Sequence, residues 1–164
     1  DIEGGSVGGS GKIHAGVLLR GSLNPGSSPG TLTIEGDVEE DSTGEIHMQF
    51  LSLDANGYDR FIVYGDLAMD GLLALELDGY VPHASDLFAG VLSWTGSLTL
   101  GDNFHISGLD LGEGFFFVPI WDANSLDIGV TGGGSSSIPE PAPALLVGSA
   151  LAAVALMTRR RRAQ

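Results

Sequence analysis

Short segments in which apolar and polar residues alternate run through the body of this chain, and most of them are bounded by glycine. Five segments carry apolar residues at every second position: 30–37 (Leu32, Ile34), 44–50 (Ile46, Met48, Phe50), 71–78 (Leu73, Leu75, Leu77), 96–100 (Leu98, Leu100) and 124–130 (Leu126, Ile128, Val130). A period of two is that of a β-strand with one buried face. We therefore expect these residues to point inward, and their neighbours, such as Thr33 and Ala74, to point outward. No helical period competes before residue 142.

The spacing of these segments indicates how the strands are arranged. They recur every 14 to 28 residues, too irregularly for a strict solenoid repeat, yet in a way that is typical of stacked strands. A β-helix is the favoured architecture, because its windings would place the alternating apolar residues in one central stack. A β-sandwich of about ten short strands is the alternative, since turns at such spacing suit both folds.

The C-terminal end differs from the body. Pro139, Glu140 and Pro141 come first, an uncharged and mostly apolar run follows at 142–157, and four arginines stand at 159–162. As a helix, the sixteen apolar residues would span about 24 Å, slightly less than the roughly 30 Å hydrocarbon core of a bilayer. Arg159, Arg160, Arg161 and Arg162 would hold the C-terminus on the cytoplasmic side. The prolines would keep the preceding stretch extended and open to a processing enzyme. An ordinary single-pass anchor is the alternative.

The order of these three parts resembles the PEP-CTERM sorting signal of Gram-negative bacteria that make exopolysaccharide, over residues 138–162. The resemblance implies that the membrane enzyme exosortase recognises Pro139, Glu140 and Pro141 and removes the helix and the basic tail. The protein would then reach the cell surface or the extracellular matrix, as a substrate and not as an enzyme. Tails of this type are also catalogued as an ice-binding protein C-terminal domain.

A second resemblance covers residues 21–130. The runs GSLNPGSSPGTLTIEGD (21–37) and YDRFIVYGDLAMDGLLALELDGYVP (58–82) are similar to a terminal module of autotransporter passengers and many PEP-CTERM proteins. The matching residues are Pro25-Gly26, Pro29-Gly30, Tyr58-Asp59, Gly65, Asp70-Gly71, Gly79-Tyr80 and Pro82. The resemblance implies a right-handed β-helix, with no active site, that caps or chaperones the part of the chain ahead of it.

Together these patterns predict four parts of the chain. They are a glycine-rich start of a fragment at 1–20, a β-helix-like extracytoplasmic domain at 21–131, a Gly/Ser linker at 132–138, and the sorting signal at 139–162 with a transmembrane helix at 142–158. Because the chain begins at Asp1 and its tail suits an exported protein, we expect a longer precursor with a signal peptide.

Charge and composition agree with export. Residues 1–138 carry 20 acidic residues and three basic ones, Lys12, Arg20 and Arg60, which gives a formal charge of −17. Such a charge argues against nucleic acid as a partner and leaves neutral or cation-bridged polysaccharide. The chain has no cysteine, so packing and not disulfides must stabilise the fold.

Few residues suggest a cofactor. The run Gly8 to Lys12 looks like a phosphate-binding loop, but Ser6 and Ile13 occupy the positions of the first glycine and of the final hydroxyl residue. The four histidines, His14, His47, His83 and His105, have no metal-ligand spacing, so solvated or edge positions are expected.

Calcium has one candidate loop. Asp54, Asn56 and Asp59 surround Gly57 with oxygen ligands, but the loop lacks the full ligand ladder of a calcium site. A hairpin turn with Asn56-Gly57 in the left-handed conformation is favoured. We predict no cofactor.

Three other activities have sequence support of a limited kind. A polysaccharide-acting enzyme would use stacked acids, for which Asp66 with Asp70, or Asp37 with Glu39, are candidates beside Arg20 or Arg60. Sugar stacking would use rings of the late region, although core packing is the favoured role of these rings; they are Trp94, Phe115, Phe116, Phe117 and Trp121. Ice binding would need a regular threonine face, of which Thr31 and Thr33 are one pair.

The sequence thus predicts an exported structural or adhesive protein of the cell surface or the exopolysaccharide matrix, and not an enzyme. Its expected partners are an exosortase-type enzyme, the inner membrane transiently, and exopolysaccharide.

Overall fold

The computed structural model describes residues 1–27 and 29–133, and these residues form strands, turns and loops with no helix. The all-β prediction is confirmed for this part of the chain. The strands are β1 (Ile2–Gly9), β2 (Gly11–Ile13), β3 (Val17–Pro25), β4 (Thr31–Ile34), β5 (Val38–Glu40), β6 (Glu45–Phe50), β7 (Arg60–Val63), β8 (Leu67–Met69), β9 (Leu72–Leu77), β10 (Leu87–Trp94), β11 (Leu98–Leu100), β12 (His105–Ser107), β13 (Asp110–Gly112), β14 (Phe115–Trp121) and β15 (Ser125–Gly132).

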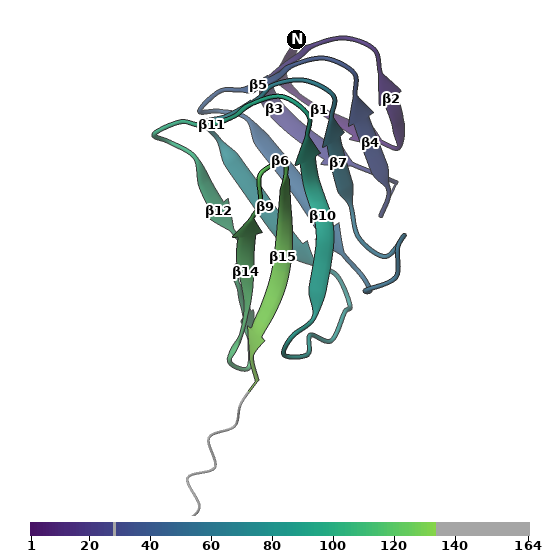
Figure 1. Ribbon diagram of the computed structural model, residues 1–164, viewed down its shortest axis with the longest axis vertical. Coiled ribbons are helices and arrows are strands. Elements are labelled where there is room, and N and C mark those ends of the chain that lie inside the picture. Colours follow the sequence, from purple (N-terminus) through teal and green to yellow (C-terminus); the bar gives the residue numbers. More distant parts are fainter. Residues whose placement is uncertain (28, 134–164) are drawn as a thin grey trace, which may run out of the picture. The chain divides into compact units, whose positions relative to one another are not determined.

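Most of these strands belong to three parallel ladders (Figure 1). The first ladder pairs β2, β4, β7 and β10. The second pairs the beginning of β3 with β5, β8 and β11, and the third pairs the end of β3 with β6, β9 and β12. The chain passes through one strand of each ladder in turn and then begins again, so each passage forms one winding. On its other edge, β3 pairs in parallel with β1.

The register of the ladders places apolar side chains on apolar side chains. In the first ladder, Leu32 pairs with Phe61 and Phe61 with Leu92, and these three residues are at most 5 % exposed. In the third ladder the predicted inward residues Ile46, Met48 and Phe50 are all fully buried, so this face is confirmed. In-register stacking of this kind removes apolar surface from water in every winding, which is the main source of stability in a chain without disulfides.

Two residues on the predicted outward side are covered by their neighbours, and one predicted inward residue is exposed. Thr33 and Ala74 alternate with inward residues as predicted, yet they are only 7 % and 6 % exposed. Both are small, and the residues paired with them on the flanking strands, such as Lys12 and Ile62 beside Thr33, leave little of their surface uncovered. Leu100 was expected in the core but is 43 % exposed, because β11 is paired on one edge only among the described residues.

The last part of the described chain changes direction. After β10 the first ladder continues through β15, β14 and β13, and all three of these pairings are antiparallel. The predicted inward residues of β15, Leu126, Ile128 and Val130, are at most 5 % exposed, as expected. Phe117 of β14 reaches the core, where its ring lies 5.0 Å from that of Phe50. The antiparallel strands therefore share one hydrophobic core with the parallel windings.

The glycine-rich start is built into the same unit, which comprises Asp1–Gly133. Residues 1–20 contain β1, β2 and the beginning of β3, and they supply Val17 and Leu19 to the core. Only Gly132 and Gly133 of the predicted linker are described. The rest of the linker, the sorting motif, the predicted helix at 142–158 and the arginine cluster lie outside the described residues.

Candidate functional site

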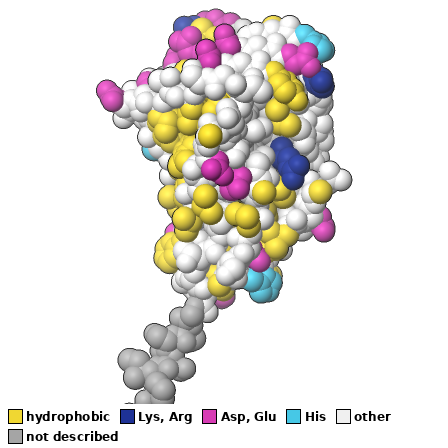
Figure 2. All heavy atoms as spheres, in the orientation of Figure 1, with side chains coloured by type: hydrophobic (Ala, Val, Ile, Leu, Met, Phe, Trp, Pro, Cys, Tyr) yellow, Lys and Arg dark blue, Asp and Glu magenta, His cyan; other side chains and the backbone are white. Residues whose placement is uncertain are grey.

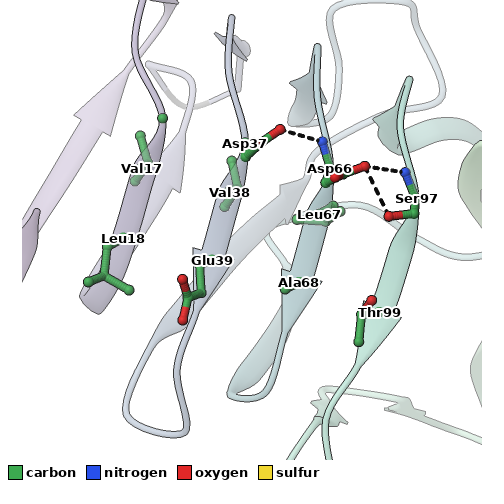
Figure 3. A pocket seen from close by; sticks show the side chains of 11 residues that line it. Val17, Leu18, Asp37, Val38, Glu39, Asp66, Leu67, Ala68, Ser97 and Thr99 are labelled. Atoms are coloured by element: carbon green, nitrogen blue, oxygen red, sulfur yellow. Dashed lines mark hydrogen bonds between the residues drawn. The ribbon is translucent and has the colours of Figure 1, made fainter.

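The turns that lead into the second ladder repeat a glycine followed by a polar residue. The pairs are Gly36-Asp37, Gly65-Asp66 and Gly96-Ser97. The backbone N–H of Asp66 donates to Oδ1 of Asp37 at 2.8 Å, and the N–H of Ser97 donates to Oδ1 of Asp66 at 2.7 Å (Figure 3). The bonded residues are 29 and 31 positions apart, so each carboxylate binds the backbone of the next winding. We call Asp37, Asp66 and Ser97 the turn row.

Glycine is required beside the turn row because the windings approach closely there. A Cβ atom on Gly65 would lie 2.5 Å from Oδ1 of Asp37 and 2.6 Å from the carbonyl oxygen of Gly36. A Cβ atom on Gly96 would lie 2.2 Å from Oδ1 of Asp66. Any side chain at these positions would push the carboxylate away from the N–H group that it binds.

Asp66 of the turn row is charged at neutral pH. Hydrogen bonds from the backbone N–H of Ser97, and then from its hydroxyl group, hold the pKa of Asp66 below its usual value. The hydroxyl bond is 2.9 Å long and goes to the same Oδ1 atom. Among the described residues, Oδ2 of Asp37 and Oδ2 of Asp66 have no bonded neighbour, so both atoms are available as acceptors.

A groove of about 560 Å³ runs beside the turn row, across the outer face of the second ladder. Its floor is one row of in-register side chains from four successive strands: Leu18, Glu39, Ala68 and Thr99. Figure 3 shows these side chains on their strands, with the turn row along one side. The groove therefore crosses the strands and follows the direction in which the windings stack. It offers aliphatic surface at Leu18 and Ala68 and oxygen atoms at the other positions.

The groove brings together three of the acids that the enzyme hypothesis named, Asp37, Glu39 and Asp66. Asp70 lines an adjoining cavity of about 220 Å³, which shares Glu39, Ala68 and Thr99 with the groove. Among the described residues that line the groove, none is a lysine, arginine or histidine. The groove can accept hydrogen bonds from hydroxyl groups, but it places no basic residue beside its acids.

The two arginines named with those acids bind elsewhere. Arg20 pairs with Glu3 at 2.9 Å and with Asp41 at 3.1 Å. Arg60 donates to the hydroxyl oxygen of Tyr58 at 2.7 Å, and its guanidinium carbon lies 4.9 Å from the centre of that ring. Neither arginine lines the groove.

The residues of the candidate calcium loop separate in the structure. Asp59 is 2 % exposed, and its two oxygens accept from the N–H groups of Gly30 at 2.8 Å and Gln49 at 2.9 Å. Asp54 stays exposed at the turn and bonds to Ser52. Within residues 1–27 and 29–133, no three acidic or histidine side chains are placed to hold a metal ion.

The predicted hairpin turn at Asn56-Gly57 is present, although its conformation differs from the expected one. Phe50 and Tyr58 form an antiparallel bridge, and the N–H of Gly57 donates to the carbonyl oxygen of Asp54 at 2.8 Å. Neither Asn56 nor Gly57 has the positive φ angle that was predicted. A longer turn, closed by two bonds from Leu51 and Ser52 to the carbonyl oxygen of Gly57, removes the need for it.

Glu40 is a buried acid that the sequence analysis did not single out. It is 2 % exposed and occupies an inward position of the second ladder, in register between Leu19 and Met69. Burial raises its pKa to about 8, against a weak bond from the N–H of Gly71 at 3.4 Å. Its Oε1 atom has no partner among the described residues. Glu40 is therefore protonated at neutral pH.

The histidines are dispersed over the surface, as expected. His14 contacts Glu35, which also pairs with Lys12 at 2.9 Å, so the lysine of the phosphate-loop-like run is part of a salt bridge. His47 is the most enclosed of the four and bridges two carboxylates, Glu76 at 2.7 Å and Glu45 at 3.1 Å. Burial lowers the pKa of His47, but the bonds to these carboxylates outweigh it, so the pKa lies above the usual value.

The late aromatic residues divide between the core and the surface. Trp94 and Phe117 are buried, at 3 % and 2 % exposure, in agreement with the favoured prediction. Phe116 is 44 % exposed and Trp121 is 37 % exposed. One face of Trp121 is occupied by neighbours, because its ring lies 6.1 Å from that of Phe104 and 6.3 Å from that of Trp94.

The threonine pair considered for ice binding is not extended into a row. In register, Thr31 pairs with Arg60, and Thr33 pairs with Lys12 and Ile62. The described windings thus provide no flat array of threonines around this pair.

No protein-family model matches this chain, and no curated protein matches it either. Residues 1–27 and 29–133 contain no helix that could cross a bilayer. The sorting residues Pro139, Glu140 and Pro141 and the cluster Arg159–Arg162 lie outside the described residues.

The turn row was not predicted, because Asp37 and Asp66 were named only as members of two candidate acid pairs, with Glu39 and with Asp70. The signal that identifies it is a glycine, then Asp or Ser, then Val or Leu, which recurs at 36–38, 65–67 and 96–98. Its intervals differ because the loops between ladders differ in length. The apolar residues of these segments do not reveal the pattern, because the polar residue that begins each segment carries it.

Proposed function

We propose that this chain is an exported structural or adhesive protein of the cell surface or the exopolysaccharide matrix, sorted by its C-terminus and processed by an exosortase-type enzyme. The observation that carries the proposal is the order of Pro139-Glu140-Pro141, the apolar run at 142–157 and Arg159–Arg162. A transient inner-membrane anchor would precede delivery. The excess of acids in the all-β body agrees with an extracellular location, because it disfavours binding to anionic lipid and nucleic acid.

We further infer that the windings of the body form a right-handed β-helix. Three features support this architecture: three parallel ladders in a repeating order, strands of matched register, and inward apolar rows common to successive windings. Right-handed crossover is the general rule for parallel strands that are joined in this way. A body of stacked windings is a scaffold, which agrees with a structural role.

The groove beside the turn row is the surface that we propose for a matrix polymer. It runs along the stack, so an extended neutral polysaccharide could follow it from winding to winding. The free oxygens of Asp37, Glu39 and Asp66 would accept bonds from sugar hydroxyl groups, and Leu18 and Ala68 would contact the apolar face of a sugar ring. Anionic polymer would be repelled by the same carboxylates.

The sorting proposal is tested by the intact mass of the protein from the surface fraction of an exopolysaccharide-producing host. The same host without exosortase is the control. Loss of the apolar run and the arginine cluster in the first host alone is the expected result. Replacing Pro139, Glu140 and Pro141 by alanine should leave the uncut, membrane-held form. An uncut tail in both hosts would reduce the segment to a plain anchor.

The groove is tested by electrophoresis through gels that contain the neutral polysaccharide of the host matrix. Thr99→Arg places a long side chain in the groove and should weaken retardation about tenfold. Ser107→Arg is the matched control, because Ser107 is an exposed residue on the neighbouring edge strand β12 and the change in charge is the same. Equal retardation of both variants would contradict the proposed polymer site.

A further inference from the structure

The antiparallel strands expose one apolar face. Leu87 of β10 pairs with Gly129 of β15, and Gly129 pairs with Val118 of β14, so these residues lie on the same side of the sheet. On β14, Phe116 and Ile120 point to this side as well, because they are two positions from Val118. The four large side chains are 39 % to 49 % exposed. We call Leu87, Phe116, Val118 and Ile120 the apolar face.

The apolar face has a hollow at its centre. Gly129 has no side chain there, and a cavity of about 390 Å³ opens between the strands, lined by Leu87, Val118 and Ile120 among others. In Figure 2, hydrophobic side chains gather on the part of the surface where Figure 1 draws β10 and β15. Apolar side chains that gather in one exposed patch with polar residues around them are typical of a contact with another molecule or with a membrane.

Three carboxylates border the apolar face. Asp86 lines the hollow, Asp127 pairs with Ile120, and Asp110 pairs with Phe116. Each of them accepts a hydrogen bond from a nearby backbone N–H group, at 2.6 to 2.9 Å. The acids therefore form a polar rim around the four apolar side chains.

The body's own charge disfavours a second copy as the occupant. Residues 1–138 have 20 acidic and three basic residues, so two bodies would repel each other on approach. A zwitterionic bilayer has no net charge and would not oppose contact in this way.

The course of the chain connects this face to the proposed anchor. Gly132, the last residue of β15, pairs with Phe115, next to the apolar face. The apolar run begins at Ala142, nine residues after Gly133. Nine residues span at most about 30 Å when fully extended. If the apolar run enters a bilayer, Gly133 is held within that reach of its surface, and with it the end of the sheet that carries Phe116.

We propose that the apolar face rests on the bilayer while the protein is anchored, with Leu87, Phe116, Val118 and Ile120 among the lipid acyl chains near the surface. The inference depends on the proposed function, because it requires the anchor. Four partly exposed side chains bind a bilayer weakly without a tether, whereas a short tether raises their effective concentration. Removal of the anchor would therefore also release this face, and processing would free the whole body in one step.

Cysteine labelling tests the inference on the full chain, which has no cysteine of its own. Val118→Cys carries an environment-sensitive dye, and the protein is reconstituted into phosphatidylcholine vesicles with brominated acyl chains. Thr99→Cys on β11 is the control, since it lies in the groove and not on the apolar face. Leu87→Cys is a second probe of the apolar face, should the first substitution disturb the fold. We expect the dye at position 118 or 87 to be quenched at least twofold more than the dye at position 99.

Flotation of the vesicles separates the two proposals. If the chain floats with the vesicles and the dyes at 118 and 87 are quenched no more than the dye at 99, the membrane contact is wrong and the anchor stands. If the chain does not float, the anchor is wrong and the inference falls with it. Shielding of the dye without lipid, in proportion to protein concentration, would overturn the inference in favour of self-association.

Discussion

Two carboxyl groups of the body are buried near strand ends, and their hydrogen bonding differs in opposite ways. Asp59, before β7, and Glu40, at the end of β5, are both 2 % exposed. Asp59 accepts one backbone N–H bond on each oxygen, at 2.8 and 2.9 Å. Glu40 has one bond of 3.4 Å, and its other oxygen has no partner among the described residues. Burial raises the pKa of both groups, but only Asp59 is compensated by full hydrogen bonding.

The comparison teaches that burial alone does not show what an acid contributes. Asp59 holds the loop before β4 against β6, because it accepts hydrogen bonds from the N–H groups of Gly30 and Gln49. Glu40 replaces an apolar residue in a stack with Leu19 and Met69, so it costs stability. A buried acid thus stabilises the fold at Asp59 and destabilises it at Glu40.

The largest effect on stability is expected from removing the carboxylate of Asp59. Asp59→Ala leaves the N–H groups of Gly30 and Gln49 without their acceptor, and we expect it to lower the free energy of unfolding by about 3 kcal/mol. Chemical denaturation monitored by tryptophan fluorescence measures the change. Asp54→Ala, at an exposed position of the same turn, should change it by less than about 0.5 kcal/mol. Equal losses in the two variants would show that the hydrogen bonds of Asp59 do not hold the loop before β4 against β6.

A substitution beside the turn row should lower the stability almost as much. Gly65→Ala places a Cβ atom 2.5 Å from Oδ1 of Asp37, so the windings must separate, and we expect a loss of about 2 kcal/mol. Gly5→Ala is the matched control, because a Cβ atom there has no neighbour closer than 4.0 Å. Thermal unfolding followed by circular dichroism compares the two. A tolerated Gly65→Ala would contradict close stacking at this turn.

Removing the uncompensated acid should stabilise the body. Glu40→Met makes the inward row apolar throughout, and we expect a gain of about 2 kcal/mol at pH 9 that shrinks towards pH 5. The sign follows from a folded pKa of about 8 against 4.5 in the unfolded chain. The folded state binds its proton more tightly, so the wild-type chain loses stability as the pH rises through this window. A gain that does not depend on pH would mean that Glu40 is not a buried, protonated acid.

The smallest effect concerns His47. Its raised pKa means that the bridge to Glu45 and Glu76 stabilises the fold below pH 6.5 and that this contribution is lost as the pH rises through the folded-state pKa. His47→Gln should therefore cost about 0.5 kcal/mol at pH 5.5 and nothing at pH 9. His105→Gln is the control, because that ring contacts the backbone carbonyl of Asn103 and no carboxylate. A loss for His47→Gln that is the same at both pH values would contradict the charged bridge.

The sequence predicts the strands of the body well where alternation is regular. The burial of Ile46, Met48 and Phe50 could be predicted, because their spacing of two residues fits only a β-strand with one buried face. Leu100 departs from its prediction because burial of an inward residue also needs a further winding beyond it. Glu40 was missed because three acids in a row, Glu39, Glu40 and Asp41, suggest an exposed turn, and alternation alone does not decide which of them faces inward.

The candidate site was less accessible to sequence reasoning. The groove combines Leu18, Glu39, Ala68 and Thr99, which share no residue type and are brought together only by the register of four strands. The apolar face depends in the same way on the pairing of β10, β15 and β14. Since the windings differ in length, these registers could not be derived from the spacing of the apolar residues.

The turn row also constrains how a chain like this one can change its length. Each carboxylate binds an N–H group one winding later, so deletion of a single residue within a strand would shift that acceptor away from its donor, whereas the loops already differ in length between windings. Deletion or duplication of a complete winding would join equivalent turns and preserve every remaining bond of this kind. Lineages of such chains should therefore grow and shrink by whole windings, and single-residue gaps should be confined to the loops between ladders.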